Sequence, residues 1–372
     1  MTHRVNLLVS SFVFMIGVGS VVGTLPIVLR QLTTNEVEIS LAVTVWGLVY
    51  LFSNIPAGLL ADKVGANKVI PVAFLLNIPI GIIMFLGSTP LDYALARALE
   101  GFLEALVWTS VIGLSVKREK NVKIIGVSGV YASIALGFVL GPLLAGSLLA
   151  ISYRTPFLLY SLCSFISFFV TLPLFRAESI RFSAQRPKLN FGWKVTSPLL
   201  SALTVGLVES LIVVYAPDLS SHKIGISSQE LLSGYYLFGL LGQISITFLH
   251  NVVLTEPYLL AAFLSSSLIT LYLPESMILI SIGWLGIINA HVSSRSQAKI
   301  AEGMQGVEST GAGIANFAWS LGYFLGAPLY SMLNARRLSP QKAIGFIFLV
   351  MLLIQLLLAV LEIRRRDSTI SK

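Results

Sequence analysis

Three ionisable residues, Arg97, Glu100 and Glu104, lie three and four positions apart within one long apolar stretch. On an α-helix this spacing places the side chains within about 60° of one another on a single face. An ionisable group inside a membrane is costly unless it is paired or hydrated, so such residues are candidates for function. If Arg97 pairs with Glu100, then Glu104 is left free to take up and release a proton. The alternative is a static cluster in which Arg97 serves both carboxylates and holds helices together.

A second carboxylate, Glu209, lies near the middle of an apolar stretch in the other half of the chain. We expect it to face the same cavity from the opposite side, and the structural alternative is a hydrogen-bonded acid that bridges helices. Other polar residues could line this cavity or make packing hydrogen bonds: His291, Asn289, Asn316, Asn54 and Gln243. Tryptophans on the same stretches could stack on aromatic or cationic substrates, or pack between helices. They are Trp46, Trp108, Trp284 and Trp319.

The elements that carry these residues are long and apolar. Of the 372 residues, 55% are hydrophobic and 11% are charged, and the mean hydropathy is +0.85. Soluble domains carry about 25% charged residues, so the composition predicts a polytopic membrane protein. A helix needs about 20 residues to cross a bilayer. Apolar runs of about this length predict about twelve spans, at residues 6–29, 39–61, 69–88, 91–116, 124–151, 156–175, 196–217, 229–249, 257–273, 276–294, 307–333 and 343–361.

The positive charges are distributed unevenly over the loops of this topology. Of the 25 lysines and arginines, 18 lie on the side that holds both termini, six lie opposite, and Arg97 lies within a span. Cytoplasmic loops carry an excess of lysine and arginine, so we expect a cell-membrane protein, plasma or inner, with both termini cytoplasmic. The net charge of +8 thus reflects orientation in the lipid bilayer rather than nucleic-acid binding. The single cysteine, Cys163, excludes an internal disulfide and a multi-cysteine metal site, and we expect no metal or other cofactor.

The loop between the second and third predicted spans has the pattern Gly58-x-x-x-Asp62-Lys63-x-Gly65-x-x-Lys68. A carboxylate at the C-terminal end of a helix opposes the helix dipole, so Asp62 needs a partner elsewhere, such as a lysine or the N-terminus of another helix. The alternative is an ordinary charged turn. The spacing resembles the signature loop of the major facilitator superfamily of transporters. This resemblance implies a cytoplasmic gate in which Asp62 engages the start of the eleventh span, near residues 303–306, in the outward-facing state.

A basic linker at residues 176–195 divides the predicted spans into six and six. We therefore expect an N-terminal six-helix bundle at residues 1–175 and a C-terminal six-helix bundle at residues 196–372. A shift of 185 residues aligns Gly137 with Gly322 and Gly141 with Gly326, as in a duplicated transporter. Small residues four positions apart let helix backbones approach closely, so these faces are also explained by packing alone.

The first copy continues as Gly137-x-x-x-Gly141-Pro142-x-x-x-Gly146. This pattern resembles the fifth-helix motif of antiporters in the superfamily, although Ala145-Gly146 stands where that motif usually has paired glycines. The resemblance implies exchange of a solute for a proton.

The segment Arg97-Ala-Leu-Glu100-Gly101 resembles the superfamily's fourth-helix motif, with Glu100 in place of the usual glutamine. With its twelve spans, central basic linker, Asp62 loop and fifth-span motif, the resemblance covers essentially the whole chain. It implies an all-α membrane protein with about twelve helices in two pseudo-symmetric six-helix bundles. It also implies a monomeric secondary transporter, not an enzyme, that moves a small organic solute by alternating access. Proton-coupled export of a drug or metabolite is the leading expectation.

Two other functions stay open at this point. The first is proton-coupled symport, or uniport, of a sugar, amino acid or other metabolite, although sugar carriers usually offer more cavity amides. The lack of a carboxylate in the first span also counts against drug export, because several proton-driven exporters of the superfamily keep one there.

The second alternative is a membrane enzyme such as a lipid transferase. Such enzymes generally cluster acidic or histidine residues at the interface, and the sequence shows no such cluster.

Overall fold

The computed structural model describes residues 2–119, 122–176, 193–221, 228–249 and 278–334, and scattered residues between 342 and 360. The regular structure in these ranges is entirely α-helical, so the predicted fold class is confirmed. The long helices described are α1 (Thr2–Leu32), α2 (Glu36–Val64), α3 (Ala66–Leu86), α4 (Pro90–Arg118), α5 (Lys123–Leu149), α6 (Thr155–Phe175), α7 (Trp193–Ser221), α8 (Ser228–Leu249), α10 (Ile278–Gly303) and α11 (Glu308–Asn334). The predicted ninth span, most of the linker and most of the twelfth span lie outside the described residues.

Eight of the described helices, α1 to α8, are long and apolar enough to cross a membrane. Helices α10 and α11 have 26 and 27 residues, which is also sufficient length. Their polar residues include Asn289, Gln297 and Asn316, which are all buried. These two helices therefore keep polar groups inside the protein, away from lipid.

Local sequence explains where the helices that carry the candidate residues begin and end. Helices α2 and α3 are separated by Gly65 alone, whose φ of 105° lies in the left-handed region that favours glycine. This break places Asp62 in the last turn of α2. Helix α4 begins with Pro90, and Thr89 and Asp92 form a reciprocal capping box. Arg97, Glu100 and Glu104 then follow within its first half.

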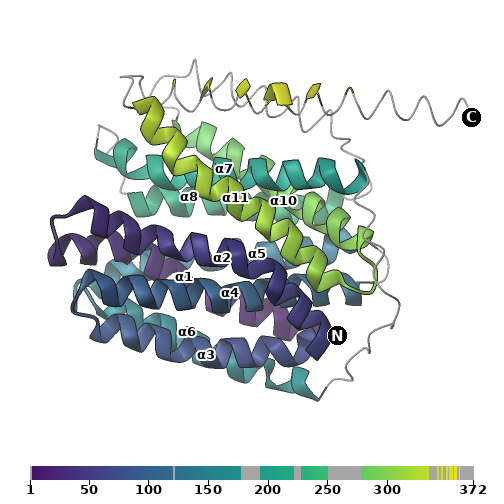
Figure 1. The fold of residues 1–372 in the computed structure, drawn as a ribbon, viewed down its shortest axis with the longest axis horizontal. Helices are drawn as coiled ribbons and strands as arrows, with labels where there is room; N and C mark the ends of the chain where they lie inside the picture. Colours follow the sequence, from purple (N-terminus) through teal and green to yellow (C-terminus); the bar gives the residue numbers. More distant parts are fainter. Residues whose placement is uncertain are drawn as a thin grey trace, which may run out of the picture.

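The helices form two groups that face each other (Figure 1). In the first group, α1 packs on α5 and α6, α3 packs on α6 and α4, and α2 packs on α4. In the second group, α7 packs on α11 and α10, and α10 packs on α8. The two groups meet mainly where α2 packs on α11 and where α5 packs on α8. A site near these seams can therefore draw residues from both groups of helices.

The glycines of α5 bring its backbone against α1. A Cβ atom added at Gly141 would lie only 2.6 Å from the carbonyl oxygen of Ile16, and Gly137 makes a similar approach one turn earlier. Pro142 packs beside Gly19 of α1. This contact has the form expected of a small-residue helix interface.

The aligned glycines of α11 make the corresponding contact with α7. A Cβ atom at Gly326 would lie 2.6 Å from Ser210 Cβ, and one at Gly322 would overlap the carbonyl of Leu203. The two halves therefore use the aligned positions in the same way. Gly146 differs, because nothing lies within 4 Å of a Cβ atom placed there. Among the described residues, the motif is therefore used for close packing at Gly137 and Gly141 but not at Gly146.

Candidate functional site

A cavity of about 610 Å³ lies between the two groups of helices. Its described wall is formed by α1, α2, α4 and α5 of the first group and by α7, α8, α10 and α11 of the second. The lining residues run from the middle of these helices toward the end opposite Asp62, for example from Tyr50 to Val43 on α2 and from Trp319 to Pro328 on α11. The volume suits a small organic molecule.

The other end of the molecule is closed by Asp62. Its Oδ1 accepts a hydrogen bond from Ser309 N at 3.1 Å, and its Oδ2 accepts from Thr310 N at 2.7 Å and Thr310 Oγ1 at 2.6 Å. A carboxylate at a helix N-terminus is stabilised by free backbone N–H groups and by the helix dipole. The partner of Asp62 is therefore the first turn of α11, a few residues beyond the segment 303–306 expected from the sequence.

Two glycines allow Ser309 to approach this closely. A Cβ atom at Gly58 of α2 would lie 2.5 Å from Ser309 O, and one at Gly113 of α4 would lie 2.5 Å from Ser309 Cα. Farther along the same seam, Asn54 Nδ2 donates to Ser320 Oγ at 3.3 Å. Sequence reasoning missed Gly113, because nothing in the spacing within α4 indicates a partner on α11.

The remaining residues of the gate loop lie at the surface. Lys63 and Lys68 are exposed, and Gly65 provides the turn between α2 and α3. The described contact of the loop with the second half is thus made by Asp62 rather than by its neighbouring lysines.

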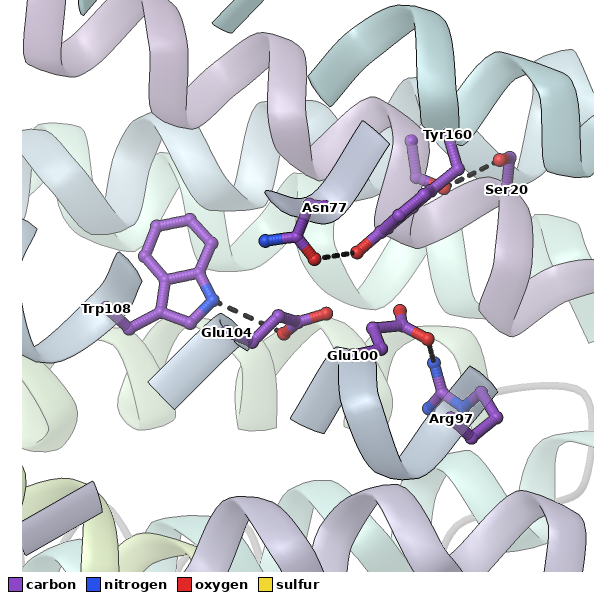
Figure 2. Close-up of polar contacts among 8 residues, drawn as sticks. Ser20, Asn77, Arg97, Glu100, Glu104, Trp108 and Tyr160 are labelled. Carbon is purple, nitrogen blue, oxygen red and sulfur yellow. Dashed lines mark hydrogen bonds and ion pairs between the residues drawn. The ribbon is translucent and has the colours of Figure 1, made fainter. Parts of the chain in front are cut away.

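The charged stripe on α4 is buried against the cavity wall (Figure 2). Arg97 Nη1 and Glu100 Oε2 form an ion pair at 2.5 Å. The guanidinium of Arg97 also lies over the ring of Trp46, with its Cζ 5.2 Å from the ring centroid. Glu104 Oε2 accepts a hydrogen bond from Trp108 Nε1 at 3.4 Å. Arg97 therefore pairs with Glu100, and no cation among the described residues forms a salt bridge with Glu104.

A neutral polar pair lies on the side of the stripe that faces α3 and α6 (Figure 2). Tyr160 OH donates to Asn77 Oδ1 at 2.6 Å, and Asn77 Nδ2 donates to Ala73 O at 2.9 Å. Glu104 lines the cavity, whereas Glu100 is not among the lining residues. A proton arriving through the cavity would therefore meet Glu104 first.

Glu209 faces the same cavity from α7. Its Oε1 accepts a hydrogen bond from Tyr236 OH of α8 at 2.7 Å, and its Oε2 accepts from Trp319 Nε1 of α11 at 3.2 Å. Glu209 thus lines the cavity and also bridges helices, which the sequence offered as alternatives. The donors Tyr236 and Trp319 could not be assigned to it from the sequence, because they lie 27 and 110 positions away.

Aromatic rings cover much of the wall between the two acidic sites. Trp46 stacks on Tyr50 with ring centroids 5.0 Å apart and planes at 11°. Tyr50 meets Trp319 edge to face at 6.2 Å, and Trp319 contacts Tyr323 at 5.2 Å. Such a wall offers flat faces to an aromatic or cationic compound.

Residues 7–327 match the family model of the Major Facilitator Superfamily. The chain belongs to this superfamily. A solved superfamily transporter, FucP in the outward conformation, shares the fold with a TM-score of 0.75 at 12% sequence identity, over 96% of this chain and 99% of that one. The predictions of the family and of its helical membrane fold are therefore confirmed.

Curated relatives of this superfamily member include the Quinolone resistance protein NorA of Staphylococcus aureus. The protein of strain MSSA476 is 26% identical over 253 residues, and that of strain Mu50 / ATCC 700699 is 25% identical over the same length. In both cases the match spans 63% of this chain and 63% of the relative.

The other polar candidates in this superfamily protein are engaged by protein groups. Asn289 donates to Tyr235 OH at 2.6 Å, Asn316 accepts from Gln297 Nε2 at 2.7 Å, and Gln243 accepts from Ser294 and donates to Ala290 O. These three residues do line the cavity. His291 instead bonds Ser245 at 2.8 Å, and Trp284 is 40% exposed; neither is among the cavity-lining residues.

Proposed function

We propose that this protein is a secondary active transporter that exports small amphipathic organic compounds in exchange for protons. The observation that carries the proposal is a cavity between two helix groups, with a carboxylate from each group on its wall, Glu104 and Glu209. The Asp62 contact closes one end of the molecule, and the cavity extends toward the other. A binding site reached from one side at a time is the requirement for alternating access.

In this proposal, residues 1–175 and 196–372 move as two bodies joined by the linker at 176–195, and the protein works as a monomer in the cell membrane. The excess of positive charge supports a cytoplasmic location for both termini and the Asp62 loop. The described state is then open to the outside. Opening the Asp62 contact while the opposite end closes would expose the same cavity to the cytoplasm.

The cavity wall favours amphipathic compounds with flat aromatic or cationic groups. Its aromatic rings offer stacking faces, and Glu209 offers a negative charge. A sugar would need many free hydrogen-bonding groups, whereas Gln243 bonds protein groups at both of its polar atoms, and Asn289 and Asn316 each have only one atom without a partner among the described residues, Oδ1 and Nδ2. The name of the NorA relatives, a quinolone resistance protein, supports the same class.

Transport of protons is tested in liposomes that hold the purified protein and a trapped pH dye. We expect aromatic cations to evoke proton movement in the wild type and in Glu119→Gln, a matched control that removes a surface carboxylate paired with Arg4. Glu104→Gln should abolish it, because this change removes the acid on the cavity wall. Compounds that are transported by the wild type without any proton movement would contradict antiport.

A further inference from the structure

We propose that Glu100 and Glu104 form one proton site, in which a single proton lies between Glu100 Oε1 and Glu104 Oε1, and that the described state holds this proton. The proposal deepens the proposed function by naming the group that carries the proton. It replaces a single acid at Glu104 by a pair of acids that binds and releases one proton as a unit.

The first observation is a pair of oxygens without donors. Glu100 Oε1 and Glu104 Oε1 are both buried and neither has a hydrogen-bond partner among the described residues, whereas the Oε2 atoms accept from Arg97 and Trp108. The two residues lie four positions apart on α4, and Figure 2 shows the carboxyl group of Glu104 pointing toward Glu100 on the same face of the helix. A buried acceptor without a donor costs roughly 1–3 kcal/mol, and more when it is charged.

A proton on one of these oxygens would give both of them a hydrogen-bond partner. The protonated carboxyl donates to the facing carboxylate, so the two orphan acceptors become a donor and an acceptor. Two carboxylates that share a site do not both ionise readily, because like charges repel in a poorly solvated environment. The geometry therefore fits one proton for the pair.

Within the part of the chain that the structure describes, Arg97 is the only cation whose charge acts on the pair. The titratable groups that face it are Arg97 of its own helix, Tyr50 of α2, Tyr160 of α6 and, across the cavity, Glu209 of α7. From α3 the neighbour that Figure 2 shows is the neutral side chain of Asn77. Tyr160 already donates its hydroxyl hydrogen to Asn77.

The net charge of the cluster also favours one shared proton. With both carboxylates ionised, Arg97 and the pair carry a net charge of −1, and one proton brings the cluster to zero. The proton comes from water in the cavity through Glu104, which lines the cavity, and Glu100 behind it shares the proton. On release the proton returns to water by the same oxygen, and the cluster regains its charge.

Glu209 provides the contrast within the same molecule. Both of its oxygens accept hydrogen bonds from neutral donors, Tyr236 and Trp319. An ionised carboxylate is therefore satisfied at Glu209 without any proton. For this reason Glu209→Gln serves as the matched control for variants of the pair.

The test is infrared spectroscopy of the full-length protein in lipid nanodiscs at neutral pH. We expect a carbonyl band of a buried carboxylic acid that shifts when H₂O is replaced by D₂O. The band should disappear in Glu100→Gln and equally in Glu104→Gln, because each change removes one of the two partners, and it should persist in Glu209→Gln. A band that survives in either glutamine variant of the pair, or no band in the wild type, would overturn the shared site.

A second measurement covers the case in which a glutamine variant folds poorly. Glu100→Asp and Glu104→Asp keep both acids but lengthen the gap, so the band should remain at a changed frequency in both. A pH-sensitive dye in weakly buffered solution can count the protons that each protein releases when the pH is raised. We expect the wild type to release one proton more than either glutamine variant. Equal numbers of released protons would reject the shared site. Because neither method needs a substrate, the band can be present while transport fails, which would reject only the proposed function.

Discussion

At the scale of single residues, the acids on the cavity wall differ in how their oxygens are satisfied. Glu209 accepts hydrogen bonds at both oxygens from Tyr236 and Trp319, so its negative charge is stabilised without a cation. Glu104 Oε2 accepts a hydrogen bond from Trp108, whereas its Oε1 has no donor among the described residues. From this difference we propose different tasks for the two acids: Glu209 would attract a cationic group, and Glu104 would exchange a proton together with Glu100.

Substrate binding should therefore depend on the charge of Glu209. We expect Glu209→Gln to weaken the binding of an aromatic cation by about tenfold, equivalent to about 1.4 kcal/mol. Tyr236→Phe keeps the charge and removes one hydrogen bond, so its effect should be smaller. Equilibrium titration of a fluorescent aromatic cation measures both, with a neutral compound of similar size as the control. An equal loss for the cation and the neutral compound would contradict a role for the charge.

At the scale of helices, the closed end depends on α2, α4 and α11 meeting without side chains between them. Ser309 at the start of α11 lies against Gly58 and Gly113, and Asp62 then reaches the free N–H groups of the first turn. This contact can break and form again, because it consists of hydrogen bonds to one helix end rather than of interlocked apolar side chains. We therefore assign it the role of a gate that separates when the other end closes.

Weakening this contact should favour the state that is open at the Asp62 end. Asp62→Asn removes the charge that the dipole of α11 stabilises, a loss of roughly 1–2 kcal/mol, or a 5–30-fold change in the ratio of the two states. Reaction of a cysteine introduced at Ser320, which is buried along the same seam, reports the opening. Unchanged reactivity in Asp62→Asn would rule out the gate.

An added methyl group at the gate should act in the same direction. Gly113→Ala places a Cβ atom 2.5 Å from Ser309 Cα, so α11 must move away from α4. Gly234→Ala is the matched control, because no atom of the described residues lies within 4 Å of a Cβ atom there. We expect the reactivity of the Ser320 cysteine to rise in Gly113→Ala and to stay unchanged in Gly234→Ala. Equal reactivity of the two alanine variants would contradict the steric argument.

At the scale of the whole molecule, the two groups of helices contact each other along α2 and α11 and along α5 and α8. The first of these seams runs from the Asp62 contact past Asn54 and Ser320 to the aromatic wall. A rotation of one group against the other would therefore open one end as it closes the other, around the acids in the middle.

Electron-spin distance measurements can detect this rotation. With Cys163 replaced by serine, labels at the exposed residues Lys63 and Gln305 report the closed end, and labels at Leu41 and Met332 report the opposite end. On addition of a transported compound, we expect a population in which the first distance is longer and the second is shorter. Distances that change in the same direction at both ends, or do not change at all, would contradict alternating access.

The sequence by itself determined the membrane class, the helical fold and most helix positions. These follow from hydropathy summed over about 20 residues, which is a local property. The spacing of Arg97, Glu100 and Glu104 is likewise local, so their common face could be predicted. The glycine pairs of α5 and α11 were also visible as a repeat.

Only the tertiary structure decided which partners these residues have. Asp62 binds Thr310 from 248 positions away, and Glu209 receives its donors from two other helices. The sequence also could not show that Gly146 has no close neighbour among the described residues or that Trp284 is not one of the cavity-lining residues. The physical reason is that lipid and protein interior are both apolar, so hydropathy alone fixes neither the rotation of a membrane helix about its axis nor its neighbours. Those are set by packing and by the need of each buried polar group for a partner.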